Sequence, residues 1–237
     1  MNERRFWLTH AALPAALFVL AFLALYRTEA DLRVADFFFS PAAGGFPARD
    51  AFWIDRVLHD GGRWLVILVA LGALLPWATG FPRAALPHRR AAGYVFLCFA
   101  LGPGLVALGK HYSNVDCPWD LERYGGAQPY VKLFEARPAE LPPGRCFPSG
   151  HSSGAFALFA FYFLWCGRRP RAARAALAGT LLAGASFALT QWARGAHFPT
   201  HDLASAWICW SVCLALHPLC FGAAAAQRPP VAVPVSS

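Results

Sequence analysis

The chain alternates between long apolar runs and shorter polar segments. Six of the runs come close to the roughly 20 residues that a helix needs to cross the hydrocarbon core of a bilayer. We expect these membrane-spanning helices at residues 6–26, 64–82, 91–109, 148–167, 175–193 and 203–226. The pattern therefore predicts an all-α integral membrane bundle of six transmembrane helices.

The polar segments between the runs differ in character. Residues 31–60 mix acids and arginines with aromatic side chains, which is typical of short helices lying at the membrane interface. Residues 228–237 are rich in Pro, Val and Ser, and we expect a disordered tail there. The sequence thus predicts one membrane domain over 1–227 followed by that tail.

Composition and charge support the membrane assignment and orient the chain. Hydrophobic residues make up 57% of the sequence and charged residues only 14%. The net charge of +8 is carried largely by short basic clusters before the first run, between the second and third, and between the fourth and fifth. Such clusters are typical of cytoplasmic loops, and they argue against a nucleic-acid partner. We therefore expect both termini in the cytoplasm of a bacterium, a multi-pass inner-membrane location, and segments 27–63, 110–147 and 194–202 on the periplasmic side.

Unusual polar residues gather in three places that this topology brings to the periplasmic side. They occupy 110–119 after the third run, 145–151 before the fourth, and 191–202 between the last two. Ionisable residues at such positions in a membrane protein are candidates for function. The topology alone thus predicts one site built from three stretches.

The second stretch has the chemistry of an anion site. Pro148 suits the first position of a helix, and the amides after it have no acceptor within the helix. The Ser149 hydroxyl and the small Gly150 leave room for an anion there. His151, in the first turn, can then act on that anion as a general acid.

The third stretch offers a nucleophile and its orienting partner. His197 and His201 are four residues apart where a loop enters a helix, and Asp202 follows directly. An imidazole oriented by a neighbour is an activated nucleophile or base. Lys110 and Arg194 supply the positive charge that a transferring phosphoryl group requires.

These three stretches, in this order, resemble the signature of the type-2 phosphatidic acid phosphatase superfamily. The resemblance rests on Lys110 with Pro118, on Pro148-Ser149-Gly150-His151, and on Gly195-x-His-Phe-x-Thr. It implies that His197 attacks phosphorus, that His151 protonates the leaving alcohol, that Lys110, Ser149 and Gly150 hold the phosphate, and that no metal or cofactor takes part. Either His201 or Asp202 would orient His197.

The chain departs from the family pattern at three places. Cys117 stands where the family usually has an arginine, Gln191 stands at a second arginine position, and His201 replaces an aspartate. Arg194, about one helical turn after Gln191, is a candidate replacement for the second arginine. Arg145 and Arg123 are candidates for the first.

Two further hypotheses concern the same stretches. Cys117 and Cys146 lie on the side expected to be oxidising, so we expect a disulfide between them. The His-x3-His spacing of His197 and His201, with Asp202 beside it, also suits a zinc ion. Pro199 between the two histidines disfavours that metal-dependent alternative.

The function that these features favour is a lipid phosphatase acting at the periplasmic face on a phospholipid or polyprenyl phosphate. Undecaprenyl diphosphate, phosphatidylglycerol phosphate, phosphatidic acid and lipid A all remain possible substrates. The alternatives are a lipid phosphotransferase on the same scaffold and a non-catalytic transporter or channel. The sequence leaves the oligomeric state open.

Overall fold

The computed structural model of the chain describes residues 3–52, 61–83 and 88–222, and every long element within them is a helix. The first apolar run forms α1 (Glu3–Trp7), the π-helical turn η1 (Leu8–Ala12) and α2 (Leu13–Arg27) in succession. The others form α4 (Gly61–Thr79), α5 (Arg89–Tyr112), α6 (Gly150–Phe156), α7 (Phe159–Trp165), α8 (Pro170–Ala193) and α9 (Pro199–Phe221). The all-α prediction is confirmed for the described residues.

Five helices in the described part of the chain are long and apolar enough to cross a membrane: Glu3–Arg27, Gly61–Thr79, Arg89–Tyr112, Pro170–Ala193 and Pro199–Phe221. These correspond to five of the six runs, and the chain is a multi-pass membrane protein. The expectation of one continuous helix over 148–167 is wrong, because α6 and α7 are separated by a turn at Ala157 and Leu158. Six crossings therefore stay a prediction.

The break between α6 and α7 has a local cause in the backbone. The amide of Leu158 bonds to the carbonyl of Ala155, and that of Ala160 bonds to Ala157. These are bonds to the third residue back, as in a 3-10 turn, which is tighter than an α-helix. The helix also begins later than expected: Gly150 is its first residue and Ser149 its N-cap, so Pro148 lies outside it.

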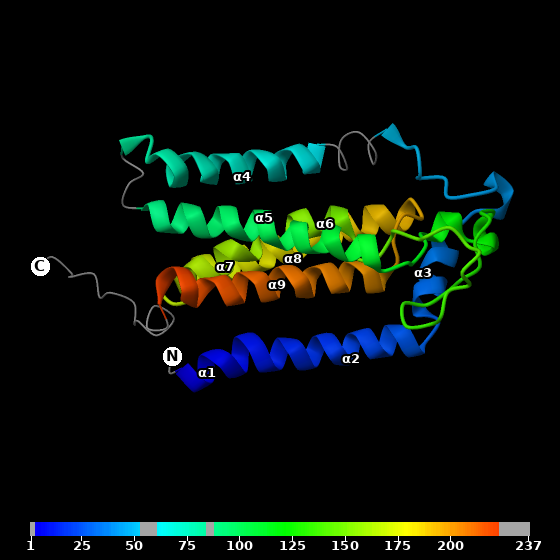
Figure 1. Ribbon diagram of the computed structural model, residues 1–237, viewed down its shortest axis with the longest axis horizontal. Coiled ribbons are helices and arrows are strands. Elements are labelled where there is room, and N and C mark those ends of the chain that lie inside the picture. Colours follow the sequence, from blue (N-terminus) through cyan, green and yellow to red (C-terminus); the bar gives the residue numbers. More distant parts are fainter. Residues whose placement is uncertain (1–2, 53–60, 84–87, 223–237) are drawn as a thin grey trace, which may run out of the picture.

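The long helices run alongside one another, with α5 and α9 in contact at the centre (Figure 1). α4 lies beside α5, and α2 lies on the opposite side of α9. The buried core between them is largely aromatic and thiol side chains, including Tyr94, Cys98, Phe156, Phe163, Cys209 and Cys213. This packing brings the starts of α6 and α9 and the end of α5 to the same end of the bundle as α3 (Figure 1).

We call α3 and the segments 39–52 and 113–149 the cap, because together they cover that end. The cap contains α3 (Ala30–Phe38) and three 3-10 turns, η2 (Pro41–Ala43), η5 (Pro118–Asp120) and η6 (Glu122–Tyr124). Its own small core is formed by Leu32, Ala35, Phe46, Leu121, Tyr124 and Phe198. α3 is the amphipathic helix expected within 31–60; residues 53–60 and the predicted disordered tail 228–237 lie outside the described residues.

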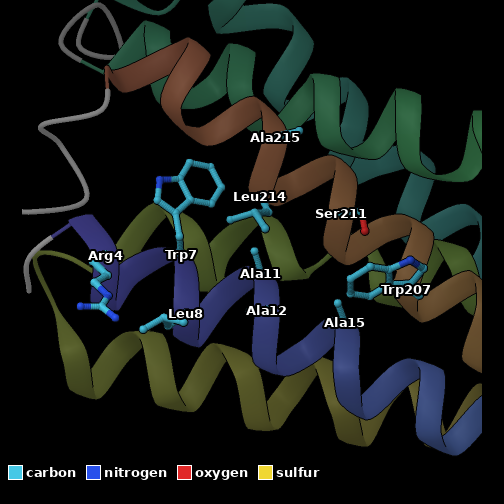
Figure 2. Close-up of a pocket in the computed structure, with 10 residues that line it drawn as sticks. All are labelled: Arg4, Trp7, Leu8, Ala11, Ala12, Ala15, Trp207, Ser211, Leu214 and Ala215. Atoms are coloured by element: carbon cyan, nitrogen blue, oxygen red, sulfur yellow. The ribbon is translucent and has the colours of Figure 1, made fainter.

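At the opposite end of the bundle, α1, η1 and α2 form an apolar groove with α9 (Figure 2). The groove has a volume of about 680 Å³, and Trp7, Leu8, Trp207 and Leu214 are among its lining residues. Exposed leucines continue this apolar surface along α2. An outward-facing surface of this kind suits contact with lipid tails.

Candidate active site

The three polar stretches of the sequence meet at the cap end of the bundle through backbone hydrogen bonds. The amide of Ser149 donates to the carbonyl of His201 at 3.1 Å, and the amide of Trp119 donates to Gly195 at 3.0 Å. The Ser205 hydroxyl, one turn into α9, donates to the carbonyls of both Ser149 and His201 at 2.7 and 3.0 Å. The starts of α6 and α9 are therefore tied together.

The loop that carries His197 is shaped by a tight turn after α8. Gly195 adopts a positive φ of 68°, which L side chains rarely adopt, and a Cβ there would lie 2.3 Å from the Phe46 ring. The Ala196 amide then donates to the carbonyl of Gln191 at 2.8 Å. This turn directs His197 into the bundle, where only 7% of it is exposed.

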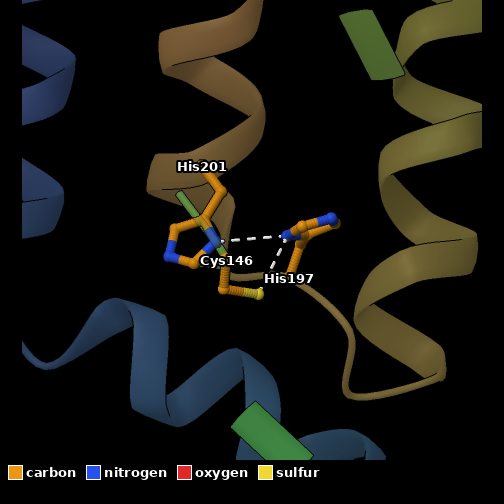
Figure 3. Close-up of side chains that lie close together, drawn as sticks. All are labelled: Cys146, His197 and His201. Carbon is orange, nitrogen blue, oxygen red and sulfur yellow. Dashed lines mark hydrogen bonds between the residues drawn. The ribbon is translucent and has the colours of Figure 1, made fainter. Parts of the chain in front are cut away.

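His197 and His201 form a buried pair of imidazoles (Figure 3). Their Nδ1 atoms are 3.3 Å apart, and His201 is 2% exposed. In such a pair one Nδ1 carries a proton and donates a hydrogen bond to the other Nδ1. The remaining nitrogen of His197 points away from His201 in Figure 3, so it is the one left for chemistry.

Cys146 lies against this pair and is joined by a disulfide to Cys117. Its Sγ is 2.9 Å from the Ala196 carbonyl oxygen and 3.4 Å from His197 Nδ1 (Figure 3). Cys146, His197 and His201 are close enough together to resemble a metal site. However, a disulfide sulfur is not a thiolate, so the group offers two imidazoles where a structural zinc site needs four ligands.

The surroundings of His197 favour its neutral form. Burial holds the pKa of His197 well below its usual 6.5, and the nearby His201, Lys110 and His151 lower that pKa further. The same interactions show that Lys110 and His151 lie within electrostatic reach of His197. A neutral imidazole keeps the lone pair that a nucleophile requires.

His151 lies at the edge of a separate cavity of about 320 Å³, bounded by α4, α5, α6 and α8. Its ring stacks on Phe187 of α8, with centroids 4.6 Å apart and an interplanar angle of 17°. Lys110 approaches from the end of α5, since a Cβ at Gly150 would lie 3.6 Å from the lysine Nζ. Lys110 Nζ therefore lies next to the first turn of α6, which carries Gly150 and His151.

Asp202 is adjacent to His201 but has other partners. Its Oδ2 accepts a hydrogen bond from Trp192 Nε1 at 2.7 Å. Ser149 and Ser152, both fully buried, lie near the same carboxylate. Of the two candidates for orienting His197, therefore, His201 contacts it directly, whereas Asp202 is hydrogen-bonded to Trp192 of α8.

A carboxylate that the sequence analysis did not single out supports the start of α9. Asp31 of α3 accepts hydrogen bonds from the Thr200 amide at 3.1 Å and the Thr200 hydroxyl at 2.5 Å. An anion at the first turn of a helix is stabilised by the free amides and the helix dipole. Burial raises the pKa of Asp31 to about 6, although both Thr200 bonds oppose that rise.

Comparison with known proteins assigns the chain to a family. The model of the PAP2 superfamily matches residues 91–223, more than half of the chain. The chain belongs to the PAP2 superfamily. The resemblance to type-2 phosphatidic acid phosphatases is thereby confirmed at the level of the family.

This PAP2 chain is similar to a curated protein, the lipid A 4'-phosphatase from Francisella tularensis subsp. novicida (strain U112). It is 26% identical over 176 residues, which cover 71% of this chain and 76% of the relative. No solved structure matches the chain.

The structure also locates the arginines that could replace the two arginines usual in the PAP2 family. Arg194 follows α8, and its Nε donates to the Arg49 carbonyl in the cap at 3.1 Å. Arg123 is paired with Asp36 on the exposed side of the cap. Arg145 is exposed, and Gln191 is buried beside Thr190.

A fourth arginine, which the sequence pattern did not indicate, is buried in the cap. Arg137 forms a bidentate ion pair with Asp116, next to the disulfide, and also donates to Gln128 and to the Pro142 carbonyl. Breaking such a buried pair by removing one partner is strongly destabilising. Nothing in the local pattern of the Pro-rich segment distinguishes Arg137 from a surface arginine.

Proposed function

We propose that this PAP2 chain is a membrane lipid phosphatase that hydrolyses a phosphomonoester or diphosphate of a lipid through a phosphohistidine at His197. The observation that carries the proposal is the buried His197–His201 pair, within electrostatic reach of His151 and Lys110. The lipid A 4'-phosphatase activity named for the relative supports hydrolysis of a lipid phosphate. Lipid A, undecaprenyl diphosphate, phosphatidylglycerol phosphate and phosphatidic acid are the candidate substrates.

In the first step the free nitrogen of His197 attacks phosphorus. A nitrogen–phosphorus bond forms, the bond to the leaving oxygen breaks, and His151 gives its proton to that oxygen. His201 accepts the Nδ1 proton of His197 in a hydrogen bond and so keeps the other nitrogen unprotonated. Lys110 and the backbone at Gly150 offset the charge on the phosphoryl oxygens.

In the second step water attacks the phosphohistidine. His151, now neutral, accepts a proton from that water, the nitrogen–phosphorus bond breaks, and inorganic phosphate leaves. The cycle uses only imidazole, ammonium and backbone groups, so we propose that it needs no metal. Activity that persists in EDTA would agree with this, and loss of activity that added metal restores would contradict it.

Orientation is part of the same proposal. We propose that the cap lies on the periplasmic side of the inner membrane, because the positive-inside rule favours a cytoplasmic position for the basic clusters. A lipid in the outer leaflet would then reach the histidines laterally, with its head group at the cap and its chains left in the bilayer.

The test is release of inorganic phosphate by the purified full chain from a panel of the four candidate lipids. We expect His197→Ala to reduce turnover by at least about 1000-fold, because a covalent nucleophile cannot be bypassed by the remaining groups. His111→Ala, which removes an exposed histidine near the same end of α5, is the matched control and should keep near-normal activity. Near-normal turnover by the folded His197→Ala variant would contradict the proposal.

A further inference from the structure

The cavity beside His151 carries a second ionisable group that the mechanism above does not use. It is lined by Arg63, Val66, Ile67, Pro103, His151, Phe187 and three glycines, and in the part of the chain that the structure describes Arg63 and His151 are its only ionisable lining residues. Arg63 lies at the start of α4, which precedes the 91–223 region matched by the family. It is therefore a feature of this chain beyond the shared catalytic core.

Close packing fixes the start of α4 relative to His151. A Cβ at Gly62 would lie 2.4 Å from the Cζ of Phe187, so the α4 backbone rests directly on that ring. The Phe187 ring also stacks on His151, with the two ring centroids 4.6 Å apart. Arg63 directly follows Gly62, and its side chain is among those that line the cavity beside His151.

The proposed reaction determines what occupies this cavity. In phosphoryl transfer the nucleophile and the leaving oxygen lie roughly in line on opposite sides of phosphorus. The general acid must be within hydrogen-bond reach of the leaving oxygen. Since His151 is the proposed acid, the part of the lipid that departs lies on the His151 side. A volume of about 320 Å³ suits a head group, while the chains stay in the bilayer.

We propose that Arg63 is a specificity-determining residue that binds a second anionic group on the leaving portion of the lipid. The favoured substrates would then be lipid diphosphates or lipids with a further phosphate near the scissile one. Phosphatidic acid, whose leaving diacylglycerol is uncharged, would be disfavoured. A guanidinium binds phosphate through two parallel hydrogen bonds. This inference rests on the proposed function only for the direction of the leaving group.

The reaction on a diphosphate balances without any additional reactant. His197 takes the terminal phosphoryl group, the P–O bond to the inner phosphate breaks, and the lipid monophosphate departs with Arg63 paired to its charge. Water then releases inorganic phosphate from His197. The net change is one water consumed for each phosphate released.

The test compares farnesyl diphosphate with farnesyl phosphate, which share one tail and differ in the charge of the leaving group. We expect Arg63→Gln to lower kcat/KM for the diphosphate by tenfold or more and to change that for the monophosphate by less than twofold. Arg33→Gln removes an exposed arginine of α3 and is the matched control, expected to change neither. Equal losses on both substrates, or no loss on either, would overturn the role of Arg63.

A binding measurement separates this proposal from the phosphatase assignment. Non-hydrolysable farnesyl methylenediphosphonate and farnesyl phosphonate are titrated into the wild-type and Arg63→Gln proteins. We expect Arg63→Gln to raise the Kd of the diphosphonate at least fivefold and to leave that of the phosphonate unchanged. Selective binding without turnover would refute the proposed function but uphold Arg63. Turnover without the Arg63-dependent selectivity would refute the role of Arg63 but uphold the proposed function.

Discussion

In the proposed mechanism, His197 is oriented by His201, which stands where the family usually has an aspartate. His201 can accept a hydrogen bond from His197 Nδ1 as a neutral imidazole, so the buried pair needs no compensating charge. An aspartate would hold the same proton but would add a negative charge that must be balanced. The free nitrogen of His197 is in both cases the one available to phosphorus.

The first prediction about these individual residues concerns the effect of pH on the rate. Because burial and the nearby Lys110, His151 and His201 hold the pKa of His197 well below 6.5, it stays unprotonated as the pH falls through that value. We expect the single-turnover rate of phosphoenzyme formation to stay level or rise between about pH 7.5 and 5.5. Rapid-quench measurement across this range tests it, and a fall in rate centred near pH 6.5 or above would contradict it.

The second prediction concerns His201. His201→Ala removes the acceptor that orients His197, and we expect kcat to fall about 100-fold, which corresponds to about 2.7 kcal/mol in the barrier. His201→Asp reintroduces an acceptor at the same position and should retain more activity than the alanine variant. Steady-state kinetics of both, with thermal melting to confirm folding, measure the difference. Equal activity in the two variants would refute the orienting role.

Among the elements, α3 and α9 are coupled most directly to the site. Asp31 and Thr200 are 169 residues apart, and their two hydrogen bonds hold the first turn of α9, from which His201 projects. The disulfide and the Arg137–Asp116 pair each link two parts of the 113–149 segment to each other. Together these contacts fix a loop region that would otherwise have few constraints.

A prediction about the contact between α3 and α9 follows from the pKa of Asp31, which burial raises from 3.8 to about 6. A raised folded-state pKa means that the native protein binds this proton more tightly. Asp31 therefore adds stability as the pH falls from above 6 to below 3.8, by up to about 3 kcal/mol. Asp31→Asn mimics the protonated form and removes this dependence.

We therefore expect Asp31→Asn to melt higher relative to wild type at pH 7 than at pH 4.5. Thermal melting of the two purified proteins at both pH values measures the difference and cancels titrations that they share. Asp36→Asn on the same helix is the control, since Arg123 and Tyr124 lower the pKa of that carboxyl and its dependence has the opposite sign. An Asp31→Asn difference that does not change with pH would contradict the assignment.

For the whole molecule, the two ends of the bundle have different chemistry. One end carries the cap, the disulfide and the histidines, and the other carries the basic clusters between α4 and α5 and before α8 (Figure 1). Lys and Arg in short loops mark the cytoplasmic side. The separation along the bundle is what makes a periplasmic active site the expected orientation.

This orientation predicts a labelling pattern in intact cells of a Gram-negative host with a permeabilised outer membrane. A membrane-impermeant maleimide should modify Glu122→Cys in the cap at once, but Arg171→Cys near the start of α8 only after the inner membrane is opened. Both positions are exposed. The wild-type chain, whose five free cysteines are buried or half-buried, provides the background. The reverse pattern would place the site in the cytoplasm.

Much of the architecture followed from the sequence because its causes are local. The length and apolarity of a run determine whether a helix can cross a bilayer, and five of the six expected spans correspond to long helices in the structure. The motif spacing around His151 and His197 was sufficient to indicate the family, since the residues of each motif lie within one turn or loop. The fourth run shows the limit, because the tight turn at Ala157 and Leu158 leaves no mark in its apolar pattern.

Only the tertiary structure decided which distant groups meet. Three contacts could not be predicted from the local sequence pattern. His197 contacts His201 rather than Asp202, Asp31 supports the start of α9, and Arg63 lines the cavity beside His151. Each depends on the rotation of one helix about its axis and on its distance from the next. Those quantities are set by side-chain packing across the whole bundle, whereas a run of apolar residues specifies only that a helix forms.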